Sequence, residues 1–174
     1  MKKALFLDRD GIINKDYGYV YKIEDFKFNE DIFDVVKYFK DRDYLVIVVT
    51  NQSGIARGYY TENDFKKLTT YMLNKFKEKN LKIDAIYHCS HSPNEACSCR
   101  KPNTKMIIDA KEEFNIDLKN SIMVGDKQSD INLGINANIK TTVAIGQREI
   151  KDATYKFNSI KEFKEALEKN LFKL

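Results

Sequence analysis

Two aspartates, Asp8 and Asp10, directly follow a short apolar run near the start of the chain. A carboxylate pair of this kind suits transfer of a phosphoryl group from a monoester. One carboxylate attacks phosphorus to form an aspartyl-phosphate, and the other protonates the leaving alkoxide and later activates water. Both anions repel the phosphate dianion, so a divalent cation is required, with Asp126 as a further ligand. Oxygen ligands favour Mg²⁺, although an isolated Asp-x-Asp also fits a structural role in a turn or helix cap.

The oxygens of a transferring phosphoryl group need hydrogen-bond donors. The Thr50 hydroxyl, the Lys101 ammonium and turn amides near Arg9 and Asn51 would supply them. Arg100 stands directly before Lys101, and the two basic residues would bind different groups of the substrate. Lysine offers a compact charge for the reacting phosphate, whereas arginine offers a planar fork for a second anion. A solvated surface charge is the structural alternative for Arg100.

All three cysteines, Cys89, Cys97 and Cys99, lie within eleven residues, and His91 lies among them. Four such ligands predict a closed tetrahedral Zn²⁺ site of the Cys₃His type, whose role is structural because no position stays open for water. The odd number of cysteines argues against a disulfide framework. His88 is the other candidate nitrogen, and ordinary buried thiols with a surface histidine are the alternative interpretation.

Composition and charge predict a globular protein. The 174 residues fit one domain, 1–174, and a hydrophobic content of 43% is enough to bury a core. The net charge of +4 is spread along the chain, so we expect no nucleic-acid partner. The apolar run at the start ends at the charged residue Asp8 and is too short for the hydrophobic region of a signal peptide. No apolar stretch is long enough to span a membrane. We therefore expect a cytoplasmic monomer that acts on a small molecule.

Hydrophobic patterns predict strands that alternate with helices along the whole chain. This alternation indicates an α/β fold, Rossmann-like, with a mostly parallel sheet and helices on both faces. The segment 44–50 runs through β-branched residues without alternation, which is typical of a parallel strand covered on both sides. The predicted strands are 4–8, 44–50, 83–89, 122–126 and about 141–145, and the predicted helices are 31–41, 61–79, 104–114, 129–137 and 159–171, with Phe65, Leu68, Met72, Leu73 and Phe76 as the buried stripe of the second.

The polar signals each come where a predicted strand ends. Asp8, Thr50 and Asp126 follow or end three strands, and the Cys/His loop follows another. Ligands of parallel α/β folds bind beyond the carboxyl ends of the strands. We therefore expect these side chains to meet in one site.

Four of these segments resemble the motifs of the haloacid dehalogenase (HAD) phosphatase superfamily, in the expected order. Residues 8–11 resemble its Asp-x-Asp motif, Thr50 and Lys101 match the second and third motifs, and 125–130 match the acidic fourth motif. The resemblance implies that Mg²⁺ is held by the Asp8 and Asp126 carboxylates and the Asp10 backbone carbonyl. It leaves Asp130 as a supporting or helix-start residue. The short segments between the motifs leave no room for a cap domain.

The zinc loop narrows the resemblance to a subgroup that includes heptose bisphosphate phosphatases and histidinol-phosphate phosphatases, with the heptose enzymes closer. This implies hydrolysis of the C7 phosphate of D-glycero-D-manno-heptose 1,7-bisphosphate, for nucleotide-activated heptose and lipopolysaccharide or surface polysaccharide synthesis. Histidinol phosphate, another small metabolite, and a zinc-stabilised binding module without turnover are the alternatives. The resemblance implies substrate contacts by Asp16, Tyr17, Gly18, Tyr19, Asn51, Gln52, Ser53, Arg100 and Lys127, with Thr50 and Lys101 in catalysis.

Two features stay open at this level. Arg57 lies in a glycine-containing loop, where a substrate contact and a plain surface charge are equally compatible with the sequence. The segment 12–28 is rich in aromatic residues and fits either a flap over the site or a packed loop. The anomer of the sugar is not determined by these residues.

Overall fold

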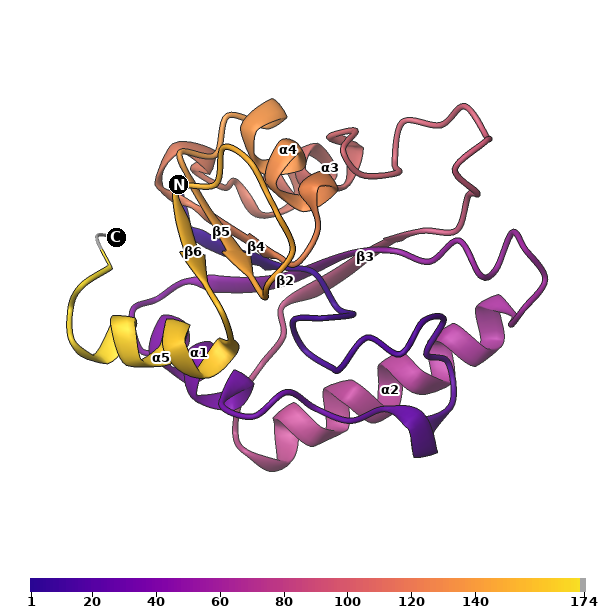
Figure 1. The fold of residues 1–174 in the computed structure, drawn as a ribbon, viewed down its shortest axis with the longest axis horizontal. Helices are drawn as coiled ribbons and strands as arrows, with labels where there is room; N and C mark the ends of the chain where they lie inside the picture. Colours follow the sequence, from indigo (N-terminus) through magenta and orange to yellow (C-terminus); the bar gives the residue numbers. More distant parts are fainter. Residues whose placement is uncertain (173–174) are drawn as a thin grey trace.

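The computed structural model describes residues 1–172 and is built around one six-stranded sheet (Figure 1). All neighbouring strands are parallel, in the order β3-β2-β1-β4-β5-β6. The strands are β1 (Ala4–Leu7), β2 (Leu45–Asn51), β3 (Ala85–Cys89), β4 (Ile122–Gly125), β5 (Thr141–Ile145) and β6 (Tyr155–Phe157). The predicted parallel α/β architecture is confirmed.

Helices cover both faces of this sheet. Three of them pack on one face and two on the other (Figure 1). The first group is α1 (Ile32–Lys40), α2 (Glu62–Glu78) and α5 (Ile160–Glu168), and the second is α3 (Lys105–Phe114) and α4 (Gln128–Asn136). Two short 3₁₀ helices are η1 (Ile23–Asp25) and η2 (Leu118–Asn120). Within residues 1–172, none of the helices has the length and apolar character that crossing a membrane requires.

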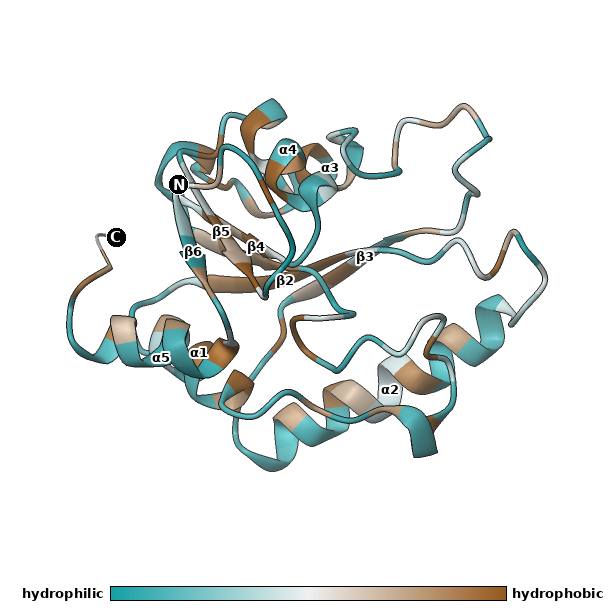
Figure 2. Ribbon diagram, in the orientation of Figure 1, coloured by the Kyte–Doolittle hydropathy of each residue, from teal (hydrophilic) through white to brown (hydrophobic). Residues whose placement is uncertain are grey.

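Strands β1 and β4 are apolar along their length, and β2 is apolar up to Thr50, because each face of these strands meets a separate core. In β1, Leu5 and Leu7 join the cluster beneath α1, α2 and α5, whereas Ala4 and Phe6 join the cluster beneath α3 and α4. All four side chains are fully buried. Figure 2 shows the same pattern as continuous hydrophobic strands flanked by helices whose outer faces are hydrophilic. Burial on both faces explains the unalternating runs in the sequence.

Helix α2 begins where the sequence predicts it. The Thr61 side chain accepts a hydrogen bond from the Asp64 backbone N–H at 3.1 Å, and the Asp64 carboxylate accepts one from the Thr61 N–H at 2.9 Å. This reciprocal capping box satisfies two donors that the first turn leaves open. Phe65, Leu68, Met72 and Phe76 are buried as predicted, but Leu73 is only half-buried because it lies at the edge of the apolar stripe.

Strand β6 is the one strand of the described residues that the patterns did not predict. It has only three residues and stands at the edge of the sheet, with Tyr155 and Phe157 half-buried and Lys156 exposed. Such a short edge strand has too few residues to produce a clear hydrophobic pattern.

The aromatic-rich segment 12–28 has a packed base and an exposed tip. Ile12, Ile13 and Phe26 are buried, and Phe26 packs edge-on against Phe28 with ring centroids 5.0 Å apart. Tyr19, near the tip, is 46% exposed. The structure therefore combines the two alternatives, because the base belongs to the core while the tip borders the site described next.

Candidate active site

The candidate site lies where the strand order reverses. From β1 the chain proceeds to β2 and β3 on one side, and β4 and β5 lie on the other. In parallel sheets, a crevice opens at this point beyond the carboxyl ends of the strands. Asp8 follows β1 and Asp126 follows β4, and these two strands are direct neighbours with Leu7 opposite Val124. The fold therefore brings together two carboxylates that lie far apart in the sequence.

Lys101 links Asp8 to a second buried carboxylate. Its Nζ lies 2.8 Å from Asp8 Oδ1 and 2.6 Å from Asp130 Oδ1, and it donates to the Val49 carbonyl at 3.0 Å. All three charged side chains are at most 5% exposed. Burial alone would lower the pKa of Lys101, but the Asp130 and Asp8 carboxylates raise it, so the ammonium stays charged.

Asn51 fixes the backbone of Lys101. Its Oδ1 accepts a hydrogen bond from the Lys101 N–H at 3.0 Å, and its Nδ2 donates to the Lys101 carbonyl at 3.4 Å. This pair of contacts joins the end of β2 to the segment that carries Arg100 and Lys101. The ammonium therefore reaches the site from a backbone that is held at a defined position.

Asp130 has a larger role than the sequence indicated. Its Oδ2 accepts a hydrogen bond from the Lys127 N–H at 3.0 Å, which caps the start of α4, and its Oδ1 contacts Lys101. Asp130 is fully buried. It therefore serves both as a helix-start residue and as a partner of the basic group beside Asp8.

The carboxylates of Asp8, Asp126 and Asp130 are arranged to fit a cation. One oxygen of each lies within 4.8 Å of the others. Asp126 Oδ1 is buried and accepts no hydrogen bond within residues 1–172, and the nearest ammonium, that of Lys127, lies 3.8 Å away. A buried carboxylate oxygen without a donor is costly unless a cation pairs with it. The donor set consists of oxygen atoms, which suits Mg²⁺.

Gly11 creates the space in which the Asp126 carboxylate lies. Its φ is +95°, and a Cβ built there would lie 2.4 Å from Asp126 Cγ. Both the backbone conformation and the close approach therefore require glycine at this position.

Burial raises the pKa of both strand-end carboxyl groups. The pKa of Asp8 rises to about 7, with Lys101 opposing the effect and Asp130 and Asp10 adding to it. Burial raises the pKa of Asp126 to about 6, opposed by Lys127. Low accessibility to water penalises the ionised form, and neighbouring carboxylates do the same. A cation bound between these groups would favour their ionised forms.

Asp10 is surrounded by donors from two parts of the chain. Arg9 Nε and Nη2 donate to its two oxygens at 3.1 and 2.9 Å, and Asn14 Nδ2 donates to Oδ1 at 3.0 Å. Gln52 Nε2 donates to Oδ2 at 3.0 Å and also to Thr50 Oγ1 at 2.8 Å. Arg9 is itself buried and donates to the Val20 carbonyl at 2.7 Å, so it ties the segment 12–28 to the site. In the sequence, the position of Arg9 between the two aspartates is the one indication of this role.

A cavity of about 280 Å³ opens beside Asp8 and Asp10. Most of the predicted substrate-contact residues line it, but Tyr17 does not and is 63% exposed. Thr50 is buried just behind the lining, where its hydroxyl accepts from Gln52, and Arg57 is exposed outside it. The lining residues are Asp8, Asp10, Asp16, Gly18, Tyr19, Asn51, Gln52, Ser53, Tyr60, Arg100, Lys101, Lys127 and Ser129.

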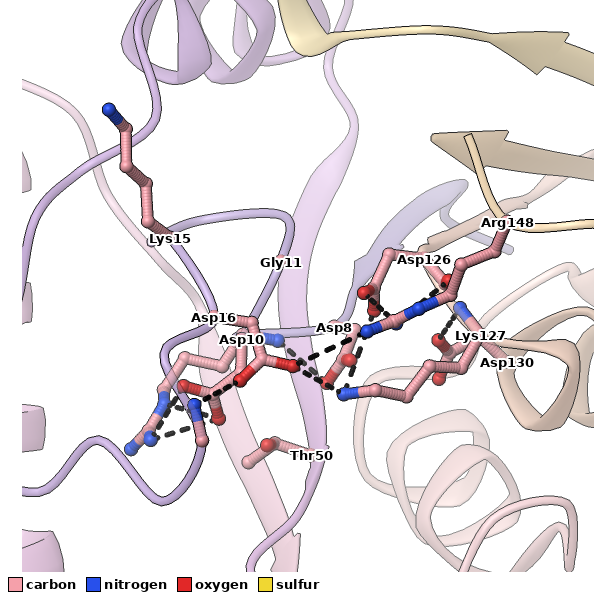
Figure 3. A network of polar contacts seen from close by, with 12 residues as sticks. Asp8, Asp10, Gly11, Lys15, Asp16, Thr50, Asp126, Lys127, Asp130 and Arg148 are labelled. Carbon is pink, nitrogen blue, oxygen red and sulfur yellow. Dashed lines mark hydrogen bonds and ion pairs between the residues drawn. The ribbon is translucent and has the colours of Figure 1, made fainter. Parts of the chain in front are cut away.

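A charged network lies beside this cavity and includes two of its lining residues, Asp16 and Lys127 (Figure 3). Lys127 Nζ lies 3.0 Å from Asp16 Oδ2 and 3.8 Å from Asp126 Oδ1. Arg148 Nη1 pairs with Asp126 Oδ2, and its Nη2 lies 4.0 Å from Asp16. The Lys15 side chain points away from the network in Figure 3. Arg148 was missed from the sequence, although its position shortly after the end of β5 matches the pattern of the other site residues.

The three cysteines and His91 converge beside the cavity, at the end of β3. His91 Nδ1 lies 3.4 Å from Cys89 Sγ and 3.2 Å from Cys99 Sγ, and Cys97 Sγ lies 3.7 and 3.9 Å from the same sulfurs. A tetrahedral zinc ion needs ligand separations of about 3.5–3.8 Å. His88 lies elsewhere, with its Nε2 3.0 Å from the Glu62 carboxylate.

One contact in this cluster differs from the prediction. The odd number of cysteines predicts that no disulfide forms here. In the structure, the sulfurs of Cys89 and Cys99 are close enough to be joined as a disulfide. A disulfide alone does not account for the convergence of Cys97 and His91 on the same point. Zinc ligation would require the Cys89 and Cys99 sulfurs to separate to about 3.8 Å.

Comparison with known proteins decides the family. Residues 98–158 match the family model described as HAD-hydrolase-like. The D-glycero-alpha-D-manno-heptose-1,7-bisphosphate 7-phosphatase of Campylobacter jejuni is 53% identical over 98% of this chain and 96% of its own length. The D-glycero-beta-D-manno-heptose-1,7-bisphosphate 7-phosphatase of Helicobacter pylori is 47% identical over 95% and 96%. The chain belongs to the heptose bisphosphate phosphatase family of HAD-like hydrolases.

Solved structures agree with this family at the level of the fold. The D,D-heptose 1,7-bisphosphate phosphatase from B. bronchiseptica, complexed with magnesium and phosphate, has a TM-score of 0.85 and 24% identity, covering 97% of this chain and 99% of that one. A HAD-like phosphatase from Mesorhizobium loti has a TM-score of 0.83 and 28% identity, covering 97% and 87%. As a member of this family, the chain is a phosphatase that hydrolyses phosphoric monoesters, which excludes a binding module without turnover.

Proposed function

We propose that this phosphatase removes the C7 phosphate of D-glycero-D-manno-heptose 1,7-bisphosphate. The observation that carries the proposal is the arrangement of basic groups in the 280 Å³ cavity. Lys101 lies at the buried end, paired with Asp8, while Arg100 and Lys127 line the same cavity. A substrate with two phosphates would meet Lys101 and Lys127 at the reacting group and Arg100 at its second anion. The names of the relatives support the same substrate.

The first chemical step would use Asp8 as the nucleophile. The Lys101 ammonium and the Arg9 N–H both contact Asp8 Oδ1. Asp8 Oδ2 is therefore the oxygen that would attack phosphorus. Attack on phosphorus forms the aspartyl-phosphate and breaks the bond between phosphorus and the C7 oxygen. Asp10 would give its proton to that leaving oxygen.

The second step would return the enzyme to its starting state. Asp10 takes a proton from a water molecule, whose oxygen attacks phosphorus and releases inorganic phosphate from Asp8. The Lys101 ammonium and the Thr50 hydroxyl would donate to the phosphoryl oxygens. The products are heptose 1-phosphate and phosphate, and the heptose 1-phosphate would supply nucleotide-activated heptose for surface polysaccharides.

We further propose Mg²⁺ as the cofactor. The Asp8 and Asp126 carboxylates and the Asp10 carbonyl would hold it, and the buried Asp126 Oδ1, which accepts no hydrogen bond within residues 1–172, supports this assignment. Bound there, the ion would neutralise the repulsion between the carboxylates and the phosphate dianion. Asp130 would support the site through Lys101, which it contacts at 2.6 Å.

We propose a structural Zn²⁺ ion at Cys89, His91, Cys97 and Cys99. The convergence of four ligand atoms supports it, since thiolate and imidazole ligands suit zinc. The ion would hold the loop that continues directly into Arg100 and Lys101. Thiolate ligands also suit a reducing compartment, so we propose a cytoplasmic location. We propose separately that the active form is a monomer.

The decisive experiment measures kcat/KM for a panel of phosphate esters. The panel contains both anomers of heptose 1,7-bisphosphate, fructose 1,6-bisphosphate and histidinol phosphate, with product analysis at C1 and C7. We expect a heptose bisphosphate to be preferred and to lose only the C7 phosphate. A higher value for histidinol phosphate, or release of the C1 phosphate, would contradict the proposal.

Arg100→Ala tests the second anion site, with Arg57→Ala as the matched control. We expect Arg100→Ala to lower kcat/KM for the bisphosphate by about 10- to 100-fold and to leave an aryl phosphate nearly unchanged. Arg57 is exposed outside the cavity, so its replacement should change neither substrate. Equal losses of Arg100→Ala on both substrates would show that Arg100 does not recognise the second phosphate.

A further inference from the structure

Tyr60 is a buried tyrosine at the cavity wall to which the chemistry above assigns no role. It is 6% exposed, and its ring stacks on Tyr21 with centroids 5.2 Å apart. Gly54 also lies against the ring, since a Cβ built there would come within 2.1 Å of Tyr60 Cε1. These two neighbours hold the ring in one position, so the location of its hydroxyl is well defined.

The Tyr60 hydroxyl contacts the Gln52 side chain, which is also buried. The oxygen lies 2.5 Å from Gln52 Oε1. An amide oxygen accepts hydrogen bonds and cannot donate them, so the tyrosine must be the donor. Burial raises the pKa of Tyr60 to about 12, which keeps this proton in place across the working range of the enzyme.

The other end of the same amide faces the reaction centre. Gln52 Nε2 donates to Asp10 Oδ2 at 3.0 Å and to Thr50 Oγ1 at 2.8 Å. The two ends of an amide are chemically opposite, so an inverted amide would turn an oxygen toward the Asp10 carboxylate. Only the orientation in which Tyr60 donates to Oε1 leaves both protons of Nε2 for Asp10 and Thr50.

We propose that Tyr60 is a positioning residue whose hydroxyl orients the Gln52 amide and thereby aligns Asp10 for proton transfer to the leaving group. This inference rests on the proposed role of Asp10 as the general acid and base. Arg9 and Asn14 also donate to Asp10, but both lie in the same chain segment as Asp10. Gln52 is the contact that holds Asp10 relative to β2 and Thr50.

Tyr60→Phe tests the proposal, because it removes the hydroxyl and keeps the ring that packs on Gly54 and Tyr21. The test compares kcat/KM on phenyl phosphate, which has a poor leaving group, with kcat/KM on p-nitrophenyl phosphate, which has a good one. This constant covers only the steps up to formation of the aspartyl-phosphate, whereas kcat also contains the second step, in which Asp10 activates water for both substrates. A good leaving group departs without help from an acid, so loss of alignment should lower kcat/KM only for the substrate with the poor one. We expect a fall of about 10- to 100-fold on phenyl phosphate and less than about threefold on p-nitrophenyl phosphate.

Two further variants make the result interpretable. Tyr59→Phe removes the hydroxyl of the neighbouring tyrosine, which is 53% exposed and does not line the cavity, and should change neither rate. If thermal melting shows that Tyr60→Phe is unfolded, Gln52→Met removes the other half of the contact and should produce the same preference for the good leaving group.

Asp10→Asn separates failure of this inference from failure of the mechanism. It should lower kcat/KM on phenyl phosphate by about 10²- to 10⁴-fold, and much less on p-nitrophenyl phosphate. If Asp10→Asn shows this selectivity but folded Tyr60→Phe and Gln52→Met lose both substrates equally or neither, the positioning role of Tyr60 is wrong. If Asp10→Asn shows no selectivity, Asp10 is not the general acid and the inference fails with that assignment.

Discussion

At the scale of single residues, the site depends on carboxylates that are costly to ionise. Asp8 and Asp126 lie at the ends of two central strands and are at most 8% exposed. Burial raises their pKa values to about 7 and about 6. Burial in the fold therefore disfavours the ionised carboxylates that the chemistry needs, and a bound cation would favour them instead.

This balance predicts how stability and magnesium binding change with pH. Each carboxyl group has a raised pKa in the folded protein, so the folded state binds more protons than the unfolded state between about pH 4 and pH 7. The stability that these two groups contribute is therefore full below about pH 4 and is lost as the pH rises through 6 and 7. Magnesium binds the ionised groups, so its stabilising effect should increase over the same window.

The measurement is the melting temperature at pH 5.5 and 7.5, with the protein depleted of magnesium by dialysis and then with excess magnesium chloride. We expect magnesium to raise the melting temperature clearly more at pH 7.5. Asp126→Asn should remove most of that difference. An equal magnesium effect at both pH values in the unaltered protein would contradict the assignment of these carboxylates as ligands.

Gly11 supplies a second prediction at the residue scale. In Gly11→Ala the new Cβ would lie 2.4 Å from Asp126 Cγ, so the carboxylate must move. We expect the magnesium concentration for half-maximal activity to rise by at least about tenfold. Gly58→Ala is the matched control, because Gly58 also has a positive φ of +72° but has open space around its missing side chain. Both variants should lose about 1–2 kcal/mol of stability from backbone strain, and an equal magnesium requirement in both would contradict the prediction.

At the scale of elements, the loops after the strands bring the catalytic groups together. The loop after β3 is held at its base by the Cys/His cluster and at its end by Asn51, which contacts both the N–H and the carbonyl of Lys101. Helix α4 starts with Asp130, whose other oxygen contacts the same lysine. Lys101 is therefore positioned jointly by a strand end, a loop and a helix start.

Cys97→Ser distinguishes zinc from a disulfide as the link that holds this loop. Cys97 is outside the Cys89–Cys99 pair, so a disulfide would survive the change, whereas a zinc site would lose a ligand. We expect about one zinc per chain in the unaltered protein and far less in the variant. The melting temperature should fall, and kcat/KM should fall at least about tenfold because Arg100 and Lys101 follow the loop.

Reduction provides the complementary control. Dithiothreitol should leave the unaltered protein stable if zinc holds the loop, and should destabilise it if a disulfide does. A zinc-free, fully folded protein that is insensitive to Cys97→Ser would mean that the zinc proposal is wrong.

At the scale of the whole molecule, stability comes from two cores on opposite faces of one sheet. Helix α5 packs on α1, and Phe163 of α5 is fully buried between Phe39 and Phe157. Phe163→Ala should lower the free energy of unfolding by about 3–5 kcal/mol, measured by urea denaturation. Because Phe163 does not line the catalytic cavity, kcat at low temperature should stay near the original value. A loss of activity without a loss of stability would contradict this separation of core and site.

Much of the fold was predictable because its signals are local. The segment 44–50 is apolar without alternation, and Thr61 with Asp64 marks a helix start through contacts three residues apart. The short edge strand β6 was not predictable, because its three residues, two half-buried and one exposed, carry too little pattern. Leu73 lies at the edge of the apolar stripe, and how far neighbouring elements cover that edge is not revealed by the helical period alone.

The sequence by itself determined which chemical groups stand at the strand ends, and therefore the class of reaction. Asp8, Thr50 and Asp126 each follow or end an apolar run, and parallel strands must bring such ends to one edge. Only the tertiary structure decided which side chains touch. In the hydrogen-bonded series Tyr60–Gln52–Asp10, Gln52 and Asp10 lie 42 residues apart in the sequence. Arg148 and Asp126, which also pair, lie 22 residues apart. These contacts depend on rotamers and on the packing of separate loops, which no spacing along the chain encodes.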